Sequence, residues 1–270
     1  MSDIASPTVL SKTDAACVSS IHRLSVIIIT LNVESHIKAC LESVRFADEI
    51  IVLDSGSTDA TVAICKCYTA LVYETDWPGF GVQKNRALAK ATGDWVLSLD
   101  ADEIVSPELA TQIKMVIAQS QAMDGYKMRR LTSFCGRYIK HGDWSRDYCL
   151  RLFKNKHAKF TDVPIHEHIV VNGKVGHISG LLYHNSYDSL AVAITKMNTY
   201  STIKAEMRHN NGKRFSLLHA LLSAMWRFMR SYVLRLGFLD GLPGLLCALM
   251  SAEGSFYGYI KLMYLEKNAE

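Results

Sequence analysis

The 270-residue sequence lacks the features that mark most nucleic-acid-binding and zinc-binding proteins. Its net charge is only +4 and it has no common DNA- or RNA-binding motif, so we expect no nucleic-acid partner. The seven cysteines are odd in number and lack the spacing of a zinc site, which favours free thiols in a reducing compartment. A zinc-protease motif of the HExxH type is also missing.

Long hydrophobic runs are missing as well. Residues 1–23 are polar and lack the apolar core of a signal peptide, so we expect a disordered N-terminal tail. Residues 241–252 carry no charge, but this stretch is too short to span a bilayer. What the chain does contain, 49% hydrophobic residues, is enough for a large buried core.

The first half of the chain alternates apolar runs with helical segments. The predicted strands are residues 24–30, 49–54, 71–73 and 95–99, and the predicted intervening helices are residues 36–44, 58–67 and 83–91. Strands that alternate with helices indicate an α/β fold with a mostly parallel, Rossmann-like sheet.

Polar residues follow the predicted strands, at the edge of the sheet where such folds bind ligands. Thr30, Asn32 and Asp54 follow the first two strands. Asp100 and Asp102 follow the fourth, and on an extended backbone they would point the same way. Two such carboxylates suit Mg²⁺ or Mn²⁺. The alternative is an acidic turn that caps the helix predicted to start at Ser106.

Four motifs occur in the order that characterises family 2 glycosyltransferases. They are residues 25–34 (SVIIITLNVE), 52–61 (VLDSGSTDAT), 81–88 (GVQKNRAL) and 100–103 (DADE). Four further motifs resemble the WaaE/KdtX-type lipopolysaccharide core transferases: residues 151–153 (RLF), 163–167 (VPIHE), 182–187 (LYHNSY) and 230–241 (RSYVLRLGFLDG).

This resemblance implies a GT-A-like catalytic domain at residues 24–210. It implies an inverting, metal-dependent enzyme that moves a hexose, by analogy glucose, from a UDP-sugar to an inner-core heptose of lipopolysaccharide. A sugar-nucleotide pyrophosphorylase is disfavoured, because no glycine-rich activating loop opens the first strand.

The metal ligands that we predict are Asp102, its partner Asp100 and the late histidine His184, each of which also has a purely structural alternative. We expect Asp100 to face the ribose or to share the metal. The residues predicted to bind the donor nucleotide are Thr30, Asn32, Glu34, Asp54, Lys84, Asn85, Arg86 and Asp100. For Lys84 and Arg86, a solvated helix face is an equal alternative.

Transfer to a hydroxyl requires a general base, and a carboxylate in a loop suits this role. We predict Glu167, with Glu103 and Asp143 as the next choices. The acceptor or phosphate candidates are Arg151, Trp144 and His166. Arg151 could instead pair with a carboxylate, and Trp144 could belong to the core.

The C-terminal third changes character. Residues 215–236 have a broad apolar helical face with basic residues opposite, which is typical of a membrane-surface helix. We therefore expect residues 211–270 to associate with the inner face of the cytoplasmic membrane. The alternatives are packing on the globular domain or a dimer interface, and the oligomeric state stays open.

Two other functions remain compatible with the sequence. One is a glycosyltransferase that acts on a polyprenyl phosphate or another lipid-linked sugar; a phosphate acceptor is already an oxyanion and needs no base. The other is a non-catalytic peripheral membrane protein on the same scaffold.

Overall fold

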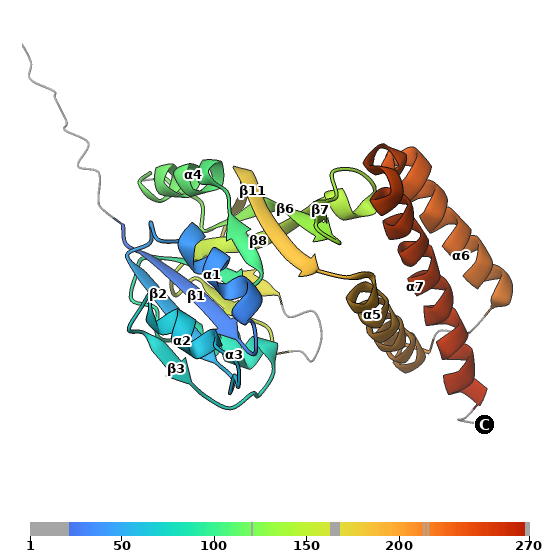
Figure 1. Ribbon diagram of the computed structural model, residues 1–270, viewed down its shortest axis with the longest axis horizontal. Coiled ribbons are helices and arrows are strands. Elements are labelled where there is room, and N and C mark those ends of the chain that lie inside the picture. Colours follow the sequence, from blue (N-terminus) through green and yellow to red (C-terminus); the bar gives the residue numbers. More distant parts are fainter. Residues whose placement is uncertain (1–21, 120, 163–167, 213, 215, 268–270) are drawn as a thin grey trace, which may run out of the picture.

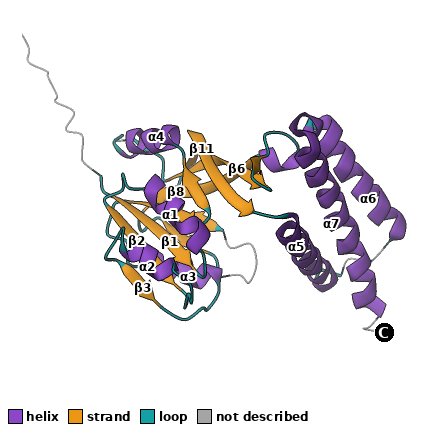
Figure 2. Ribbon diagram, viewed as in Figure 1, coloured by secondary structure: helices purple, strands orange, loops and turns teal. Residues whose placement is uncertain are grey.

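The computed structural model describes residues 22–119, 121–162, 168–212, 214 and 216–267. A mixed sheet covered by helices forms the first part, and three long helices lie to one side of it (Figures 1 and 2). The predicted tail, residues 1–23, lies outside the described residues except for its last two positions.

The parallel half of the sheet has the strands that the sequence predicts. β1 (Leu24–Thr30) lies between β2 (Glu49–Asp54) and β4 (Trp95–Asp100), and β3 (Val72–Glu74) pairs with β2, all in parallel. The helices of this half are α1 (Glu34–Ser43), α2 (Thr61–Lys66) and α3 (Phe80–Leu88). The order 3-2-1-4 brings the carboxyl ends of β1, β2 and β4 to one edge.

The second half of the sheet is mixed. The order continues from β4 through β8 (Asp147–Lys154), β6 (Gly125–Phe134) and β11 (Val175–Tyr187) to β5 (Glu103–Val105). β8 runs antiparallel to both β4 and β6, whereas β11 runs parallel to β6. The remaining strands and the fourth helix are β7 (Arg137–Tyr138), β9 (Ala158–Phe160), β10 (Ile169–Val171) and α4 (Pro107–Ile117).

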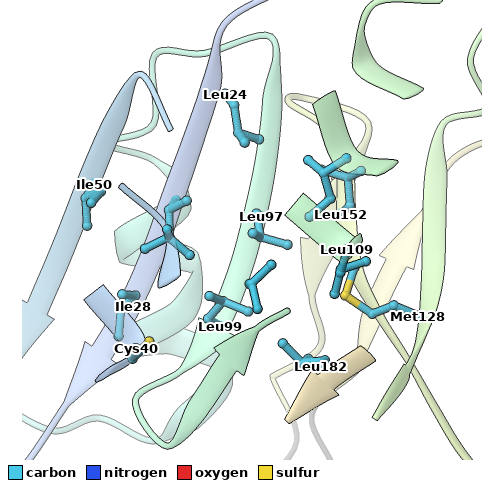
Figure 3. Close-up of a cluster of buried hydrophobic side chains, with 14 of the residues drawn as sticks. Leu24, Ile28, Cys40, Ile50, Leu97, Leu99, Leu109, Met128, Leu152 and Leu182 are labelled. Carbon is cyan, nitrogen blue, oxygen red and sulfur yellow. The ribbon is translucent and has the colours of Figure 1, made fainter. Parts of the chain in front are cut away.

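The largest buried cluster joins the two halves of the sheet (Figure 3). Leu97 and Leu99 of β4 are at most 1% exposed and share this cluster with Leu152 of β8 and Leu182 of β11. Each fully buried leucine contributes about 1.5–3 kcal/mol to folding. The cluster therefore holds β4 and β11, which both carry site residues, at a fixed separation.

The boundaries of helix α3 differ from the predicted ones. α3 starts at Phe80 and ends at Leu88, three residues before the predicted segment at each end, because Gly79 with φ 113° supplies the turn into it. The helix after Ser106 begins as predicted, and the Ser106 hydroxyl accepts a hydrogen bond from the Leu109 amide at 3.1 Å.

Three helices form a C-terminal bundle. α5 (Leu190–Asn210), which we placed with the catalytic region, packs on α7 (Gly241–Lys267), and α7 also packs on α6 (Leu217–Met229). Between α6 and α7 lie a π-helical turn, η2 (Arg230–Leu234), and a 3-10 turn, η3 (Gly237–Asp240). The uncharged stretch 241–252 is the start of the continuous helix α7 rather than a separate segment.

Within the described residues, we find no single helix with the length and hydropathy of a bilayer-spanning segment. Leu217–Leu234 and Gly237–Glu266 pass that test only as a pair, with a bend of 69° between them.

Candidate active site

A cavity of about 930 Å³ opens at the carboxyl ends of β1 and β4. Thr30 and Leu31 line one end, and Asp100 and Asp102 lie along it. The other end reaches Trp144, next to the C-terminal bundle; that end is also lined by Tyr187, Lys196 and Tyr200. The cavity thus joins the sheet edge that the sequence singles out to the bundle.

Asp102 and His184 face each other in this cavity. β4 ends at Asp100, and the following turn directs Asp102 toward β11, where its Oδ2 lies 3.3 Å from His184 Nε2. His184 Nδ1 lies 3.3 Å from the Thr132 hydroxyl, which fixes the ring. A carboxylate oxygen and an imidazole nitrogen are a suitable donor pair for Mg²⁺ or Mn²⁺.

No cluster of three metal-binding side chains occurs in the described part of the chain. Two protein ligands fit a metal that is bound together with a diphosphate, because Mg²⁺ usually takes its other ligands from water and substrate phosphates. Asp102 and His184 are the residues that could hold such an ion.

Asp100 also lines the cavity, but it pairs with cations and not with His184, which corrects the prediction of two carboxylates aimed at one point. A turn rather than an extended strand follows Asp100, so its carboxylate accepts hydrogen bonds from Arg151 and from Lys84, the latter at 2.8 Å. Burial alone would raise the pKa of Asp100, but the charges of Arg151 and Lys84 hold it well below its usual range.

Glu103 belongs to the same ion-pair network, which disfavours it as a general base. Glu103 is fully buried and accepts hydrogen bonds from Arg151 at 2.6 Å and Arg130 at 3.1 Å. Arg151 is 7% exposed; burial opposes its charge, but Asp100 and Glu103 raise its pKa well above the usual value. Arg151 therefore pairs with carboxylates, which was the structural alternative to a role in binding phosphate or the acceptor.

Asp143, the other alternative to Glu167 as general base, is also paired with cations. Its two carboxylate oxygens pair with Arg230 at 2.5 Å and Arg235 at 2.6 Å. The nearby backbone amides of Lys140 and His141 donate to Asp240 of η3. These contacts fasten the cavity-lining loop to the junction between α6 and α7.

The predicted nucleotide residues at β1 and β2 hold one another. The Thr30 hydroxyl donates to Asp54 at 2.8 Å, and Asp54 also accepts the Gly56 and Ser57 amides. Asn32 accepts the amide of Thr58 at 2.8 Å, and Glu34 accepts that of Ala60 at 2.9 Å. Of the four predicted residues, only Thr30 lines the cavity, and the others shape the adjoining turn.

The predicted residues of α3 also have structural partners. Lys84 is 3% exposed and neutralises Asp100 rather than lying on a solvated face. Asn85 both donates to and accepts from the Phe160 backbone at 2.9 Å. Arg86 pairs with the exposed Asp76 at 2.7 Å. Neither Asn85 nor Arg86 lines the cavity.

Of the residues predicted to bind the acceptor, Trp144 lies in the cavity and His166 lies outside the described residues. Trp144 lines the cavity and also packs on Tyr187, with ring centroids 4.8 Å apart, so both interpretations apply. His166 and Glu167 lie outside the described residues. The residues on either side of that segment, Thr161 and His168, form a backbone hydrogen bond of 3.0 Å.

Several residues of the cavity were not predicted from the sequence. Arg130, which pairs with Glu103 and Asp147, lies in a segment with no distinctive motif. His36 pairs with Asp188 at 2.9 Å across 152 residues, a contact that no local pattern could indicate. Asn185, Ser186 and Tyr187 also line the cavity, and all three belong to the LYHNSY motif, which could have indicated them.

Comparisons with known proteins identify the family of the chain. The family model described as glycosyl transferase family 2 matches residues 25–169. The chain is 32% identical over 256 residues to an uncharacterized glycosyltransferase of Rickettsia typhi, covering 90% of this chain and 87% of that protein. It is 30% identical over 247 residues to the lipopolysaccharide core biosynthesis glycosyltransferase LpsC of Rhizobium meliloti, covering 88% and 91%.

Among solved structures, glucosyl-3-phosphoglycerate synthase from Mycobacterium tuberculosis in complex with Mg²⁺ and UDP is similar over 41% of this chain and 44% of that chain. The sequence identity is 27% and the TM-score is 0.35.

The chain belongs to glycosyltransferase family 2. It is a glycosyltransferase with a GT-A-like fold, a mostly parallel sheet flanked by helices and followed by a helical C-terminal bundle.

Proposed function

We propose that this glycosyltransferase is inverting and metal-dependent, and that it moves a hexose from a UDP-sugar to an inner-core heptose of lipopolysaccharide. The observation that carries the proposal is the Asp102–His184 pair, 3.3 Å apart in a cavity of about 930 Å³. The likeness to LpsC over most of the chain supports the acceptor class.

In this proposal, a bound divalent cation would act as a Lewis acid toward the diphosphate leaving group. Asp102 and His184 would hold that cation. The turn that Asp54 and Asn32 hold would receive the nucleoside. Trp144 and Tyr187, at the opposite end of the cavity, offer aromatic faces to the acceptor sugar.

The proposed general base is Glu167. Among the described residues, the carboxylates that line the cavity are all paired: Asp100, Asp102, Asp143, Asp147 and Asp188. A base for an acceptor hydroxyl therefore has to come from another segment. Phe160 and His168, which flank residues 161–167, line a neighbouring cavity together with Asp100, and this supports a base from that segment.

Replacing the base tests the acceptor chemistry. We expect Glu167→Gln to lower kcat by about 10²–10⁴-fold while leaving the KM of the donor unchanged, because only proton transfer is lost. Steady-state kinetics with a UDP-sugar and truncated lipopolysaccharide measure both constants. The matched control is Glu74→Gln, an exposed residue of β3. Near-normal turnover would favour a phosphate acceptor, which needs no base.

A donor panel tests the function itself. The purified protein is incubated with UDP- and GDP-sugars, with and without truncated lipopolysaccharide, and the released nucleoside diphosphate is measured. We expect release to require a UDP-hexose, a divalent cation and the acceptor. Release with GDP-sugars alone, or no release with any donor, would contradict the proposal.

The proposal also places the enzyme on the inner face of the cytoplasmic membrane. α6 exposes a continuous row of large apolar side chains: Leu217, Leu218, Leu221, Leu222, Met225, Trp226 and Met229, each at least 43% exposed. The segment 211–252 contains five lysines and arginines and one acidic residue, and two of the five, Arg230 and Arg235, pair with Asp143. An apolar face with this charge excess suits a bilayer that contains anionic lipids.

Charges placed on this face test the membrane proposal. We expect Leu218→Glu/Leu222→Glu to weaken binding to phosphatidylglycerol vesicles at least tenfold, because two leucines no longer enter the bilayer. Co-sedimentation measures the binding. The control is Met115→Glu, an apolar residue of α4 that is 54% exposed. Unchanged vesicle binding, or a dimer of the native protein that the double variant dissociates, would contradict it.

A further inference from the structure

A small cavity of about 160 Å³ lies between the three helices of the C-terminal bundle. Lys204 and Arg208 of α5 and Arg227 of α6 line it. None of the acidic residues on these helices lines it: Glu206 and Glu253 are exposed, and the half-buried Glu266 lies near the end of α7. Three cations therefore meet in one cavity with no carboxylate among its described lining residues.

These three cations lie close together, with Lys204 exposed and Arg208 and Arg227 half-buried. Arg208 rests on the Tyr259 ring at 3.9 Å, and its Nη1 is buried without a hydrogen-bond acceptor. No ion pair involves Lys204, Arg208 or Arg227 within the described chain. Partial burial and the charges of Arg227 and Arg208 lower the pKa of Lys204. A group of like charges that includes a buried guanidinium nitrogen without an acceptor suits an anionic ligand.

The small cavity adjoins the proposed acceptor end of the active site. Trp144, Tyr187 and Tyr200 line both cavities. A substrate that occupies the larger cavity can therefore extend a substituent past these rings. Guanidinium and ammonium groups that converge on a small cavity are the typical recognition elements for phosphate.

We propose that Lys204, Arg208 and Arg227 form a binding site for a phosphate group, distinct from the site of the donor diphosphate. The phosphate is carried either by the acceptor saccharide or by a membrane lipid. The acceptor version rests on the proposed function, whereas the phosphate site itself does not.

Inorganic phosphate is the first probe. At constant ionic strength we expect phosphate to raise the melting temperature of the native protein in a saturable way. Lys204→Met and Arg227→Gln should weaken this response about tenfold each, since a charge-assisted hydrogen bond is worth roughly that factor. In chloride buffer both variants should melt no lower than the native protein, because repulsion is relieved. The control is Lys38→Met, an exposed residue of α1.

Two further measurements separate the sources. If the acceptor carries the phosphate, both variants raise the KM of truncated lipopolysaccharide about tenfold at unchanged kcat, and phosphatase treatment of the acceptor removes the difference. If a lipid carries it, both variants weaken co-sedimentation with vesicles that contain phosphatidic acid, but not with phosphatidylcholine alone. An equal phosphate response in native protein and variants, or a lower melting point of the variants in chloride, overturns the proposal. Inactivity toward lipopolysaccharide, by contrast, would refute only the proposed function.

Discussion

Asp102→Asn is expected to lower kcat/KM for sugar transfer on the order of a thousandfold, the effect of removing a principal electrostatic group from an active site. The amide keeps the size of the side chain but removes the negative charge that would bind the cation. Because Asp102 is partly exposed and contacts only His184 among the ion pairs, the fold should not change. Initial rates at several Mn²⁺ concentrations measure the effect.

The matched control for this variant lies at the other end of the same strand. Asp94 precedes β4, is 57% exposed and accepts a hydrogen bond from the Arg23 amide at 2.9 Å. We expect Asp94→Asn to retain normal activity. Equal activity of Asp102→Asn and Asp94→Asn would refute the role of Asp102, and a metal requirement unchanged in Asp102→Asn would refute it as a ligand.

Arg151→Leu is expected to destabilise the protein by about 3–5 kcal/mol, the usual cost of removing one partner of a buried ion pair. Arg151 lies between Asp100 and Glu103, and Glu103 is fully buried. Its removal would leave Glu103 with Arg130 alone and Asp100 with Lys84 alone. Urea unfolding followed by circular dichroism measures the free energy of unfolding.

Two controls distinguish a network effect from a general loss of charge. Arg45 pairs with Glu42 on the surface, so Arg45→Leu should leave the urea midpoint unchanged. The double variant Arg151→Leu/Glu103→Leu removes both partners and should be more stable than Arg151→Leu alone. If the double variant is the less stable of the two, the buried pair is not the source of the loss.

Local chemistry made much of the sheet predictable. β1 and β2 have the predicted boundaries, because continuous β-branched runs favour strands buried on both faces and turn residues follow them. Ser106 caps its helix as predicted, because capping depends on residues within one turn. The four family motifs lie within this region, so the class of enzyme was also predictable.

The direction of individual side chains was less predictable. Lys84 and Arg151 lie 16 and 51 positions from Asp100 in the sequence, and both pair with its carboxylate. Arg86 is a cation of the same helix as Lys84, but it pairs with Asp76 on the surface. The sequence of a helix does not show which of its cations pairs with a carboxylate in the site.

Residues within a few positions of one another account for the alternating strands and helices, the acidic residues after β4 and the apolar, basic character of the last third, so these features could be predicted from the sequence. The packing of distant segments, in contrast, brings Asp102 to His184, Asp100 to Arg151 and α5 to α7. It also brought Lys204 beside Arg227. Contacts between distant segments depend on how the chain packs. Whether a charged side chain on one segment finds a partner on another therefore depends on the tertiary structure.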